Sequence, residues 1–168
     1  MEILRNYLEI KSIKKLNEVK KPIQNCTLNL EDSKDFHLNK FLYKQIGRKY
    51  NWTDRLIWSD KKWISYVFDK SLTTYVLKIN NDLAGYFELI FHEKKLEVEI
   101  AYLGILEEYF GKKLGAYLLS EAIKKSFLFK PKRIWVHTCS LDHKYALKNY
   151  LARGMIVYKT ENLIKESA

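Results

Sequence analysis

The spacing of apolar residues predicts two helices in the first half of the chain and a change to strand spacing at about residue 73. Apolar residues recur at helical spacing over about 34–48, after a cap at Asp32 or Ser33, and again over about 60–68, after a cap at Ser59. From residue 73 onward apolar and polar residues alternate, which indicates strands. The strands predicted there are Thr73–Ile79, Leu83–Phe91 and Leu96–Ile105.

Short polar turns separate these three strands, so they are predicted to form an antiparallel meander. Further strands are predicted at Arg5–Ile10, Ile23–Leu30, Arg133–Cys139 and Met155–Thr160, and further helices over about 113–127 and from about Asp142. The side chains expected to be buried on the first two helices are Phe36, Leu38, Phe41, Leu42, Ile46, Trp63, Ile64, Val67 and Phe68.

This order of elements predicts one α+β domain over residues 1–168. It divides into N-terminal strands (1–30), a helical pair (31–70) and a half that holds the meander and all that follows it (71–168). A chain of 168 residues is long enough to bury a sizeable core.

Composition narrows the class of protein. The chain is 47% hydrophobic and 14% aromatic, which favours a globular fold over disorder. No apolar run approaches the ~18 residues of a membrane span, and the N-terminal residues lack the apolar region of a secretion signal. We therefore expect a cytoplasmic protein with no membrane partner, in which Cys26 and Cys139 are reduced thiols.

The net charge of +10 raises the question of a nucleic-acid partner. The lysines far outnumber the arginines and are spread along the chain rather than gathered on one helix, so a nucleic-acid surface is not favoured. A basic nucleic-acid-binding module nevertheless stays as the alternative from another class. The same charge suits capture of a polyanionic small molecule.

One segment has the chemistry of a phosphate site. In Leu103–Leu119 (LGILEEYFGKKLGAYLL) an apolar strand ends, a turn with glycines and two lysines follows, and an amphipathic helix begins. The free N–H groups and the dipole of a helix N-terminus favour an anion, and Lys112 and Lys113 add positive charge. The glycine spacing is that of neither a P-loop nor a dinucleotide fingerprint, so another phosphate-bearing ligand is expected.

The turn resembles the acyl-CoA-binding motif of the GNAT N-acetyltransferase superfamily, usually written Q/R-x-x-G-x-G/A. Here the motif runs from Phe110 to Gly115, and Gly115 matches. Phe110 stands in place of Gln or Arg, and Lys113 in place of the first Gly. Because glycine at a positive φ angle is not freely replaced, Lys113 is the departure that bears most on ligand binding.

A second motif of the same family is similar to a segment downstream. Ala146, Tyr150 and Gly154 have the spacing of N-x-x-A-x-x-x-Y-x-x-x-G-F, with His143 in place of Asn and Met155 in place of Phe. The two motifs occur in the family's order, and the resemblance covers roughly Thr73 to Thr160, about half of the chain. The resemblance implies a mixed, mostly antiparallel central sheet flanked by helices, in the order β-α-α-β-β-β-α-β-α-β.

The resemblance also implies acetyl-CoA as the acyl donor. Main-chain groups of Leu103 and Ile105 would hold the acetyl and pantetheine groups, and the turn would cradle the pyrophosphate. The turn residues are Phe110, Gly111, Lys112, Lys113, Leu114, Gly115 and Ala116. His143 would line the cleft in place of Asn, and Asn149 would reach pantetheine or the adenine side.

Carboxylates in the apolar strands are candidates for a general base. Glu97 and Glu99 alternate with apolar residues, so they project from one face of their strand, roughly 7 Å apart. They form either an exposed or salt-bridged pair, or a pair of which one accepts a proton from an amine. By resemblance Glu99 has the position of the family's glutamate base. Glu88, on the neighbouring strand, is the reserve candidate.

Two further groups complete the reaction that the resemblance implies. The tyrosine of the second motif, Tyr150, would protonate the leaving thiolate, a role that a phenol can fill. The backbone N–H of Leu103 would polarise the thioester carbonyl as an oxyanion hole does. The alternative for Tyr150 is core packing with its hydroxyl at the surface.

Two other clusters have less specific interpretations. His137, Cys139, Asp142 and His143 are too few and too poorly spaced for a zinc site or an armed cysteine, so no metal is expected and Asp142 is predicted to cap the following helix. Trp52 and Trp58 lie among carboxylates and form either a core edge or an acceptor-binding wall that suits a cationic amine. Glu88 and Glu97 are further candidates for contact with the acceptor.

The sequence therefore predicts a GNAT-type enzyme that transfers an acetyl group from acetyl-CoA to a primary amine by direct attack. Glu99, Leu103 and Tyr150 are its predicted catalytic residues. A non-catalytic acyl-CoA-binding or regulatory domain of the same fold is the first alternative. The acceptor is expected to be a small molecule or a peptide, and its identity stays open. Whether the protein forms a homodimer also stays open.

Overall fold

A seven-stranded sheet runs through the computed structural model of the protein, which describes residues 2–164. The strands are β1 (Glu2–Ile10), β2 (Cys26–Leu30), β3 (Leu72–Ile79), β4 (Asp82–His92), β5 (Glu97–Ile105), β6 (Arg133–Cys139) and β7 (Ile156–Ile164). The helices of the same region are α1 (Phe36–Gly47), α2 (Asp60–Phe68), α3 (Leu114–Phe127) and α4 (Ala146–Ala152). None of these helices is both long and apolar enough to cross a lipid bilayer.

The strands lie side by side in the order β2-β3-β4-β5-β6-β1-β7. Every neighbouring pair is antiparallel except β5 and β6, which are parallel. The predicted meander is the run β3-β4-β5. The α+β class, the mostly antiparallel sheet and the predicted order of helices and strands are confirmed.

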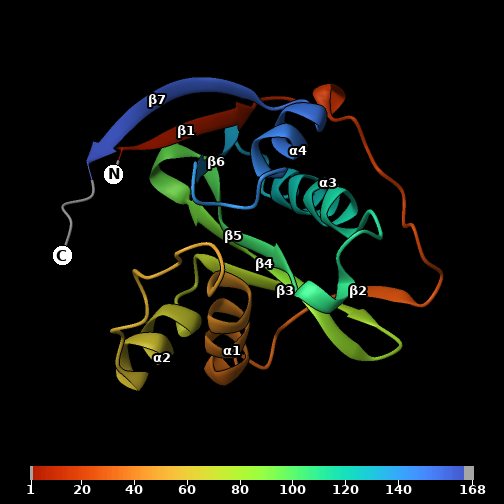
Figure 1. Ribbon diagram of the computed structural model, residues 1–168, viewed down its shortest axis with the longest axis vertical. Coiled ribbons are helices and arrows are strands. Elements are labelled where there is room, and N and C mark those ends of the chain that lie inside the picture. Colours follow the sequence, from red (N-terminus) through yellow and green to blue (C-terminus); the bar gives the residue numbers. More distant parts are fainter. Residues whose placement is uncertain (1, 165–168) are drawn as a thin grey trace.

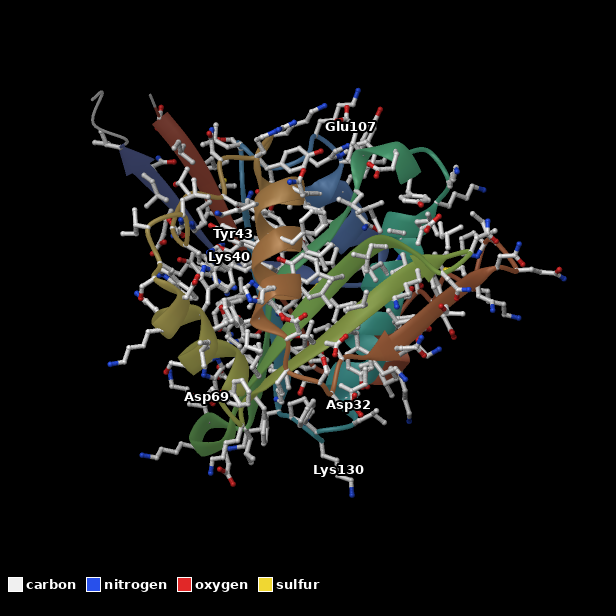
Figure 2. All side chains as sticks on the ribbon, turned by 90° about the horizontal axis from the view of Figure 1, so that it is seen from below. Asp32, Lys40, Tyr43, Asp69, Glu107 and Lys130 are labelled. Atoms are coloured by element: carbon white, nitrogen blue, oxygen red, sulfur yellow. The ribbon has the colours of Figure 1, made fainter. Side chains whose placement is uncertain are left out.

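Helices cover both faces of the sheet (Figure 1). The C-terminal pair α3 and α4 lies on one face, and the pair α1 and α2 lies on the other. Figure 2 shows α1 crossing the strands, with Lys40 and Tyr43 projecting toward the side of α2. Lys40 pairs there with Asp60, with 2.8 Å between Nζ and Oδ1, and the Tyr43 hydroxyl accepts the backbone N–H of Arg55 at 3.1 Å.

The N-terminal strand is part of the C-terminal half of the sheet. β1 lies between β6 and β7 and pairs with both, from Glu2 opposite Ile164 to Ile10 opposite Ile134. The two ends of the described chain therefore lie close together (Figure 1). The periodicity predicted β1 as a strand but gave no information on its neighbours.

The main core lies between the sheet and α3, where Leu118, Leu119 and Ile123 are fully buried. On the opposite face Leu42 and Ile46 of α1 are buried, together with Trp63 and Val67 of α2, as predicted. Three residues predicted to be buried are exposed instead, because each lies on the side of its helix that faces away from the sheet. They are Phe41, Ile64 and Phe68.

Two predicted helix starts shift for an identifiable reason. α1 is capped by Asp35, whose carboxylate accepts the backbone N–H of His37 at 2.9 Å, rather than by Asp32 or Ser33. Asp142 does not cap α4 either. Its carboxylate accepts the Thr138 hydroxyl at 2.5 Å and the Cys139 N–H at 3.0 Å, so it closes the turn after β6 and the helix begins at Ala146.

Candidate active site

The two parallel strands at the centre of the sheet part from each other. β5 and β6 are paired only from Glu97 opposite Arg133 to Glu99 opposite Trp135. Beyond this point β5 continues beside β4 and β6 continues beside β1, so each keeps one neighbour while the other side opens. Ala101 is an extra residue in β5 relative to β4, a bulge that redirects the strand at the start of the gap.

Leu103 and Ile105 lie in β5 alongside this gap, opposite Phe87 and Gly85 of β4. Both side chains pack toward the core on the α3 face, and Ile105 is buried there. No strand among residues 2–164 pairs with the other edge of β5 beyond Glu99, so its backbone polar groups need another partner. The gap can therefore take a ligand that forms main-chain hydrogen bonds, as predicted for pantetheine.

The turn after β5 leads to an uncapped helix N-terminus. Gly111 has φ +80°, and Lys113, the N-cap residue of α3, has φ +60° in the left-handed region. No side chain in the described part of the chain caps this end of α3, and a Cβ added to Gly111 or Gly115 would meet nothing within 4 Å. The first N–H groups of α3, beside the lysines of the turn, are therefore open to an anionic ligand.

Lys113 occupies the position where the family motif has glycine. Its left-handed backbone explains the motif, because only glycine adopts that conformation without steric cost. A residue with a side chain costs roughly 1–2 kcal/mol in this conformation. The turn has thus kept its shape, and the chain carries strain to keep it.

Aromatic rings from three loops meet beside this turn. The His143 ring lies 5.3 Å from that of Phe110 and 5.7 Å from that of Tyr50, both edge-on, and its Nδ1 accepts the Tyr145 N–H at 3.2 Å. His143 therefore lies next to the α3 turn, and its role in lining a CoA cleft stays a prediction. Asn149 donates its side-chain amide to the Gly115 carbonyl at 3.2 Å and so ties α4 to the start of α3.

Tyr150 lies on the α3–α4 face, in the same core cluster as Ile105, and Leu103 packs against that cluster. The residue is only 9% exposed. Burial, and to a lesser extent the negative charge of Asp142, raises the pKa of the Tyr150 phenol above its usual value. Its hydroxyl therefore keeps its proton at neutral pH, and the raised pKa makes this phenol a weaker acid than a free tyrosine.

Glu88 belongs to a closed network on the opposite face. Its side chain is 0% exposed and accepts from Arg55 Nη1 at 2.9 Å, Asn39 Nδ2 at 2.9 Å and the Tyr66 hydroxyl at 2.6 Å. The rings around the Arg55 guanidinium, with centroids 4.1–5.6 Å from Cζ, belong to Tyr43, Trp58, Trp63, Tyr66 and Tyr102.

The charges of this network stabilise each other. Burial opposes the charge of Arg55, but Glu88 and the neighbouring tyrosines raise the pKa of the guanidinium. Burial also raises the pKa of Tyr66 far above its usual value, with Glu88 acting in the same direction. Glu88 thus meets only hydrogen-bond donors in a buried network, and no part of its side chain is exposed for contact with a substrate.

Glu97 and Glu99 project toward the α1–α2 face, opposite the buried Val98 and Ile100. Arg133 donates to Glu97 from Nε at 3.0 Å and from Nη2 at 3.4 Å, and it also reaches Glu9 at 3.0 Å. Glu97 is therefore held in an ion-paired cluster two residues from Glu99.

Glu99 has a different partner. His92 Nε2 lies 2.9 Å from its Oε2, and the His92 ring is stacked on that of Trp135 at 6.2 Å with an interplanar angle of 18°. Trp135 is opposite Glu99 in the last paired position before β5 and β6 part. Glu99 thus lies at the start of the gap, on the face opposite Tyr150.

Trp52 and Trp58, the predicted core edge or acceptor-binding wall, pack the loop between α1 and α2 against its neighbours. Trp52 packs so closely on Gly47 that a Cβ there would lie 2.5 Å from the Trp52 Cβ, and its ring contacts Tyr102 edge-on at 4.6 Å. Trp58 covers Arg55 and, with Tyr66, lines a pocket of about 320 Å³ between α2 and the sheet. They stabilise the loop on the face where Glu99 lies.

Neither Arg55 nor His92 is among the residues that the sequence pattern pointed to. A signal for Arg55 exists in hindsight, since Glu88 interrupts a strongly apolar strand and a buried carboxylate requires a cation. No local pattern links His92 to Glu99, which lies seven residues on across a turn. Within residues 2–164 no three His, Cys, Asp or Glu side chains are grouped so as to hold a metal ion.

A family model described as the acetyltransferase (GNAT) family matches residues 35–155. The chain belongs to the GNAT acetyltransferase family. The match extends over α1, the meander, the gap and both motifs, so the resemblance predicted from the two motifs is confirmed. No curated protein sequence matches this GNAT chain significantly.

Solved structures confirm the GNAT fold. A GCN5-related N-acetyltransferase from Sphaerobacter thermophilus superposes with a TM-score of 0.73 at 12% identity, covering 94% of this chain and 49% of its own. An aminoglycoside acetyltransferase from an uncultured soil metagenomic sample gives 0.64 at 12% identity, covering 79% and 90%. The ribosomal-protein-S18-alanine N-acetyltransferase of Escherichia coli gives 0.60 at 16% identity, covering 77% and 76%.

These identities establish a shared fold and no more. The chain also spans only about half of the Sphaerobacter protein and 55% of a GCN5-related N-acetyltransferase from Kribbella flavida, which has a TM-score of 0.65 at 14% identity and covers 94% of this chain.

Proposed function

We propose that the protein is an N-acetyltransferase that transfers the acetyl group of acetyl-CoA to a primary amine by direct attack. The observation that carries the proposal is the gap between β5 and β6 beside the uncapped N-terminus of α3. These features supply main-chain partners for an extended ligand and an anion site at its end. A cytoplasmic location is part of the proposal.

The donor would bind through main chain and charge. Leu103 and Ile105 would form hydrogen bonds to the acetyl and pantetheine groups along the gap. The N–H groups at the start of α3, with Lys112 and Lys113, would hold the pyrophosphate. Because these contacts are made by backbone, Phe110 in place of the usual Gln or Arg does not remove them.

Acceptor and donor would meet through the gap. The amine would approach from the α1–α2 face, beside the loop that Trp52 and Trp58 hold. Glu99 would accept a proton from the amine, and the Leu103 N–H would polarise the carbonyl that the amine attacks. From the opposite face Tyr150 would donate its proton to the departing thiolate and regain one from solvent.

Among the candidate carboxylates the partners favour Glu99 as the base. Glu88 and Glu97 each form an ion pair with a guanidinium, which does not give up its proton in proteins, so each carboxylate already has a permanent cationic partner. Glu99 is 20% exposed and faces an imidazole at the start of the gap. The acceptor itself stays open, since the structural neighbours act on acceptors as different as aminoglycosides and a ribosomal protein.

Thermal unfolding with acetyl-CoA, CoA and ATP at matched ionic strength tests the donor site. Ligand at ~100 times its Kd should add about 2.7 kcal/mol, a rise in Tm of roughly 5–10 °C for this size. Both CoA species should produce the rise, and ATP little of it. The Gly115→Glu variant should fold, because a Cβ there has open space, yet lose the rise through bulk and negative charge.

The matched control is Ala152→Glu, which adds the same side chain at an exposed position of α4 and should keep the rise. Undiminished CoA binding by Gly115→Glu would show that the turn is not the pyrophosphate site. Release of free thiol from acetyl-CoA is then followed across a panel of amines. A chain that binds CoA tightly but acetylates none of them would support the non-catalytic acyl-CoA-binding alternative.

A further inference from the structure

His92 is the partner that distinguishes Glu99 from the other carboxylates of this face. Guanidinium groups hold Glu88 and Glu97 by charge, with both side chains committed to those pairs. His92 instead offers a single ring nitrogen, 2.9 Å from Oε2, and leaves the Oε1 atom of Glu99 outside that contact. A carboxylate held by one oxygen keeps the other available to take a proton from an acceptor.

The ring of His92 is itself fixed in place. It lies at the end of β4, immediately before the turn Glu93–Lys95, and is stacked on Trp135. Trp135 pairs with Glu99 across β5 and β6 at the last position before the strands part. The stack therefore sets the direction of Nε2, and Nε2 sets the orientation of the Glu99 carboxylate at the start of the gap.

We propose that His92 is a positioning residue for the Glu99 base, a role that rests on the proposed function. In the neutral tautomer with its proton on Nε2, His92 donates to Oε2 and holds the carboxylate in one rotamer. Oε1 then accepts the proton that the attacking amine gives up, and Glu99 passes it to water before the next turnover. His92 keeps its own proton throughout and does not touch the substrate.

Two substitutions separate the hydrogen bond from the packing. His92→Gln places an amide N–H near the position of Nε2 but loses the ring, whereas His92→Phe keeps a ring on Trp135 and loses the donor. A base contributes about 10²–10⁴-fold to rate, so we expect His92→Phe to lower kcat about 10-fold or more, with His92→Gln within about threefold of wild type. KM for acetyl-CoA should stay unchanged in both.

The combination with Glu99→Gln gives the second readout. If His92 acts only through Glu99, then His92→Phe should cause no further loss of kcat in the Glu99→Gln background. His37→Phe is the matched control, because His37 is exposed on α1 and contacts neither Glu99 nor Trp135. Its kcat should equal that of wild type.

The outcomes distinguish this proposal from the function beneath it. Wild-type protein that acetylates no amine overturns both. Active wild type with a slow Glu99→Gln but an unimpaired His92→Phe overturns the positioning role alone. It is also overturned if His92→Gln is as slow as His92→Phe, since the restored donor would then fail to rescue the base. Losses from His92→Phe and Glu99→Gln that multiply would overturn it as well, since His92 would then act independently of Glu99.

Discussion

Replacement of Glu88 by Gln tests whether this carboxylate stabilises the fold or takes part in the reaction. The substitution keeps the shape of the side chain and removes its charge. The guanidinium of Arg55, whose side chain is only 6% exposed, would then be buried with no carboxylate beside it. Asn39 and Tyr66 would lose the charge of the acceptor that both now share.

The cost follows from the burial of both partners. Breaking a buried pair by removing one charge costs about 3–5 kcal/mol. For a chain of this size each kcal/mol lowers Tm by about 2–4 °C, so Glu88→Gln should unfold roughly 6–20 °C below wild type. Replacing both charges by apolar residues avoids the uncompensated cation, so Arg55→Met with Glu88→Leu should be more stable than Glu88→Gln.

Far-ultraviolet circular dichroism during heating and urea titration measures these differences, and acetyl transfer is assayed well below each Tm. We expect Glu88→Gln to lose stability while the fraction that remains folded keeps its kcat. A loss of less than about 1 kcal/mol, the size of an ordinary hydrogen bond, would refute the reasoning from burial. If kcat fell steeply at the same time, Glu88 rather than Glu99 would be the better assignment for the base.

Four further predictions follow from individual positions. Tyr150→Phe should lower kcat and leave the Kd of acetyl-CoA near that of wild type, and unchanged turnover across pH would remove Tyr150 as the acid. Gly154→Ala should lower Tm in thermal unfolding, because residue 154 has φ +101° and its Cβ would lie 2.0 Å from the Lys15 carbonyl oxygen; an unchanged Tm would contradict this packing. Lys113→Gly should raise the free energy of unfolding by about 1 kcal/mol in urea titration, because glycine adopts the left-handed conformation of residue 113 without steric cost. A loss of stability would mean that the lysine side chain stabilises the fold by more than its backbone conformation costs. The free energy of unfolding should stay constant up to about pH 10 and then fall by up to about 1.4 kcal/mol per pH unit for each buried tyrosine. The reason is that tyrosines ionise above about pH 10 in the unfolded chain, while burial raises the pKa of the same groups in the folded state. Urea titrations at pH 8 and 10.5, with tyrosine ionisation followed by absorbance, test this for Tyr66, Tyr86, Tyr102 and Tyr150.

Local pattern was enough to predict most of the secondary structure. The pattern over 73–105 gave the meander to within one residue at every strand end, because the turns between the strands are short and polar. The positive φ of Lys113 was also foreseeable, since the family motif reserves that position for glycine. These features depend on neighbours in sequence.

Features that depend on distant pairing were not predictable in the same way. The position of β1 between β6 and β7 joins residues more than 120 apart in sequence, and no periodicity records it. The contact of Arg55 with Glu88 and that of His92 with Glu99 depend on how the helices and turns pack on the sheet. The exposure of Phe41 and Phe68 has the same origin, because helical spacing gives an apolar side without saying what covers it.

The insertion of β1 between β6 and β7 has a consequence for folding of the chain. β1 precedes both of its partners along the chain, and more than 120 residues separate it from the nearer one, β6. Until these strands pair β1 has two unpaired edges, and closing so long a loop slows folding. β6, which forms one side of the gap, keeps only β1 as a neighbour where it leaves β5. The gap is thus complete only when β1 has paired with β6, a contact between residues more than 120 apart in sequence, so the proposed donor site forms late in folding.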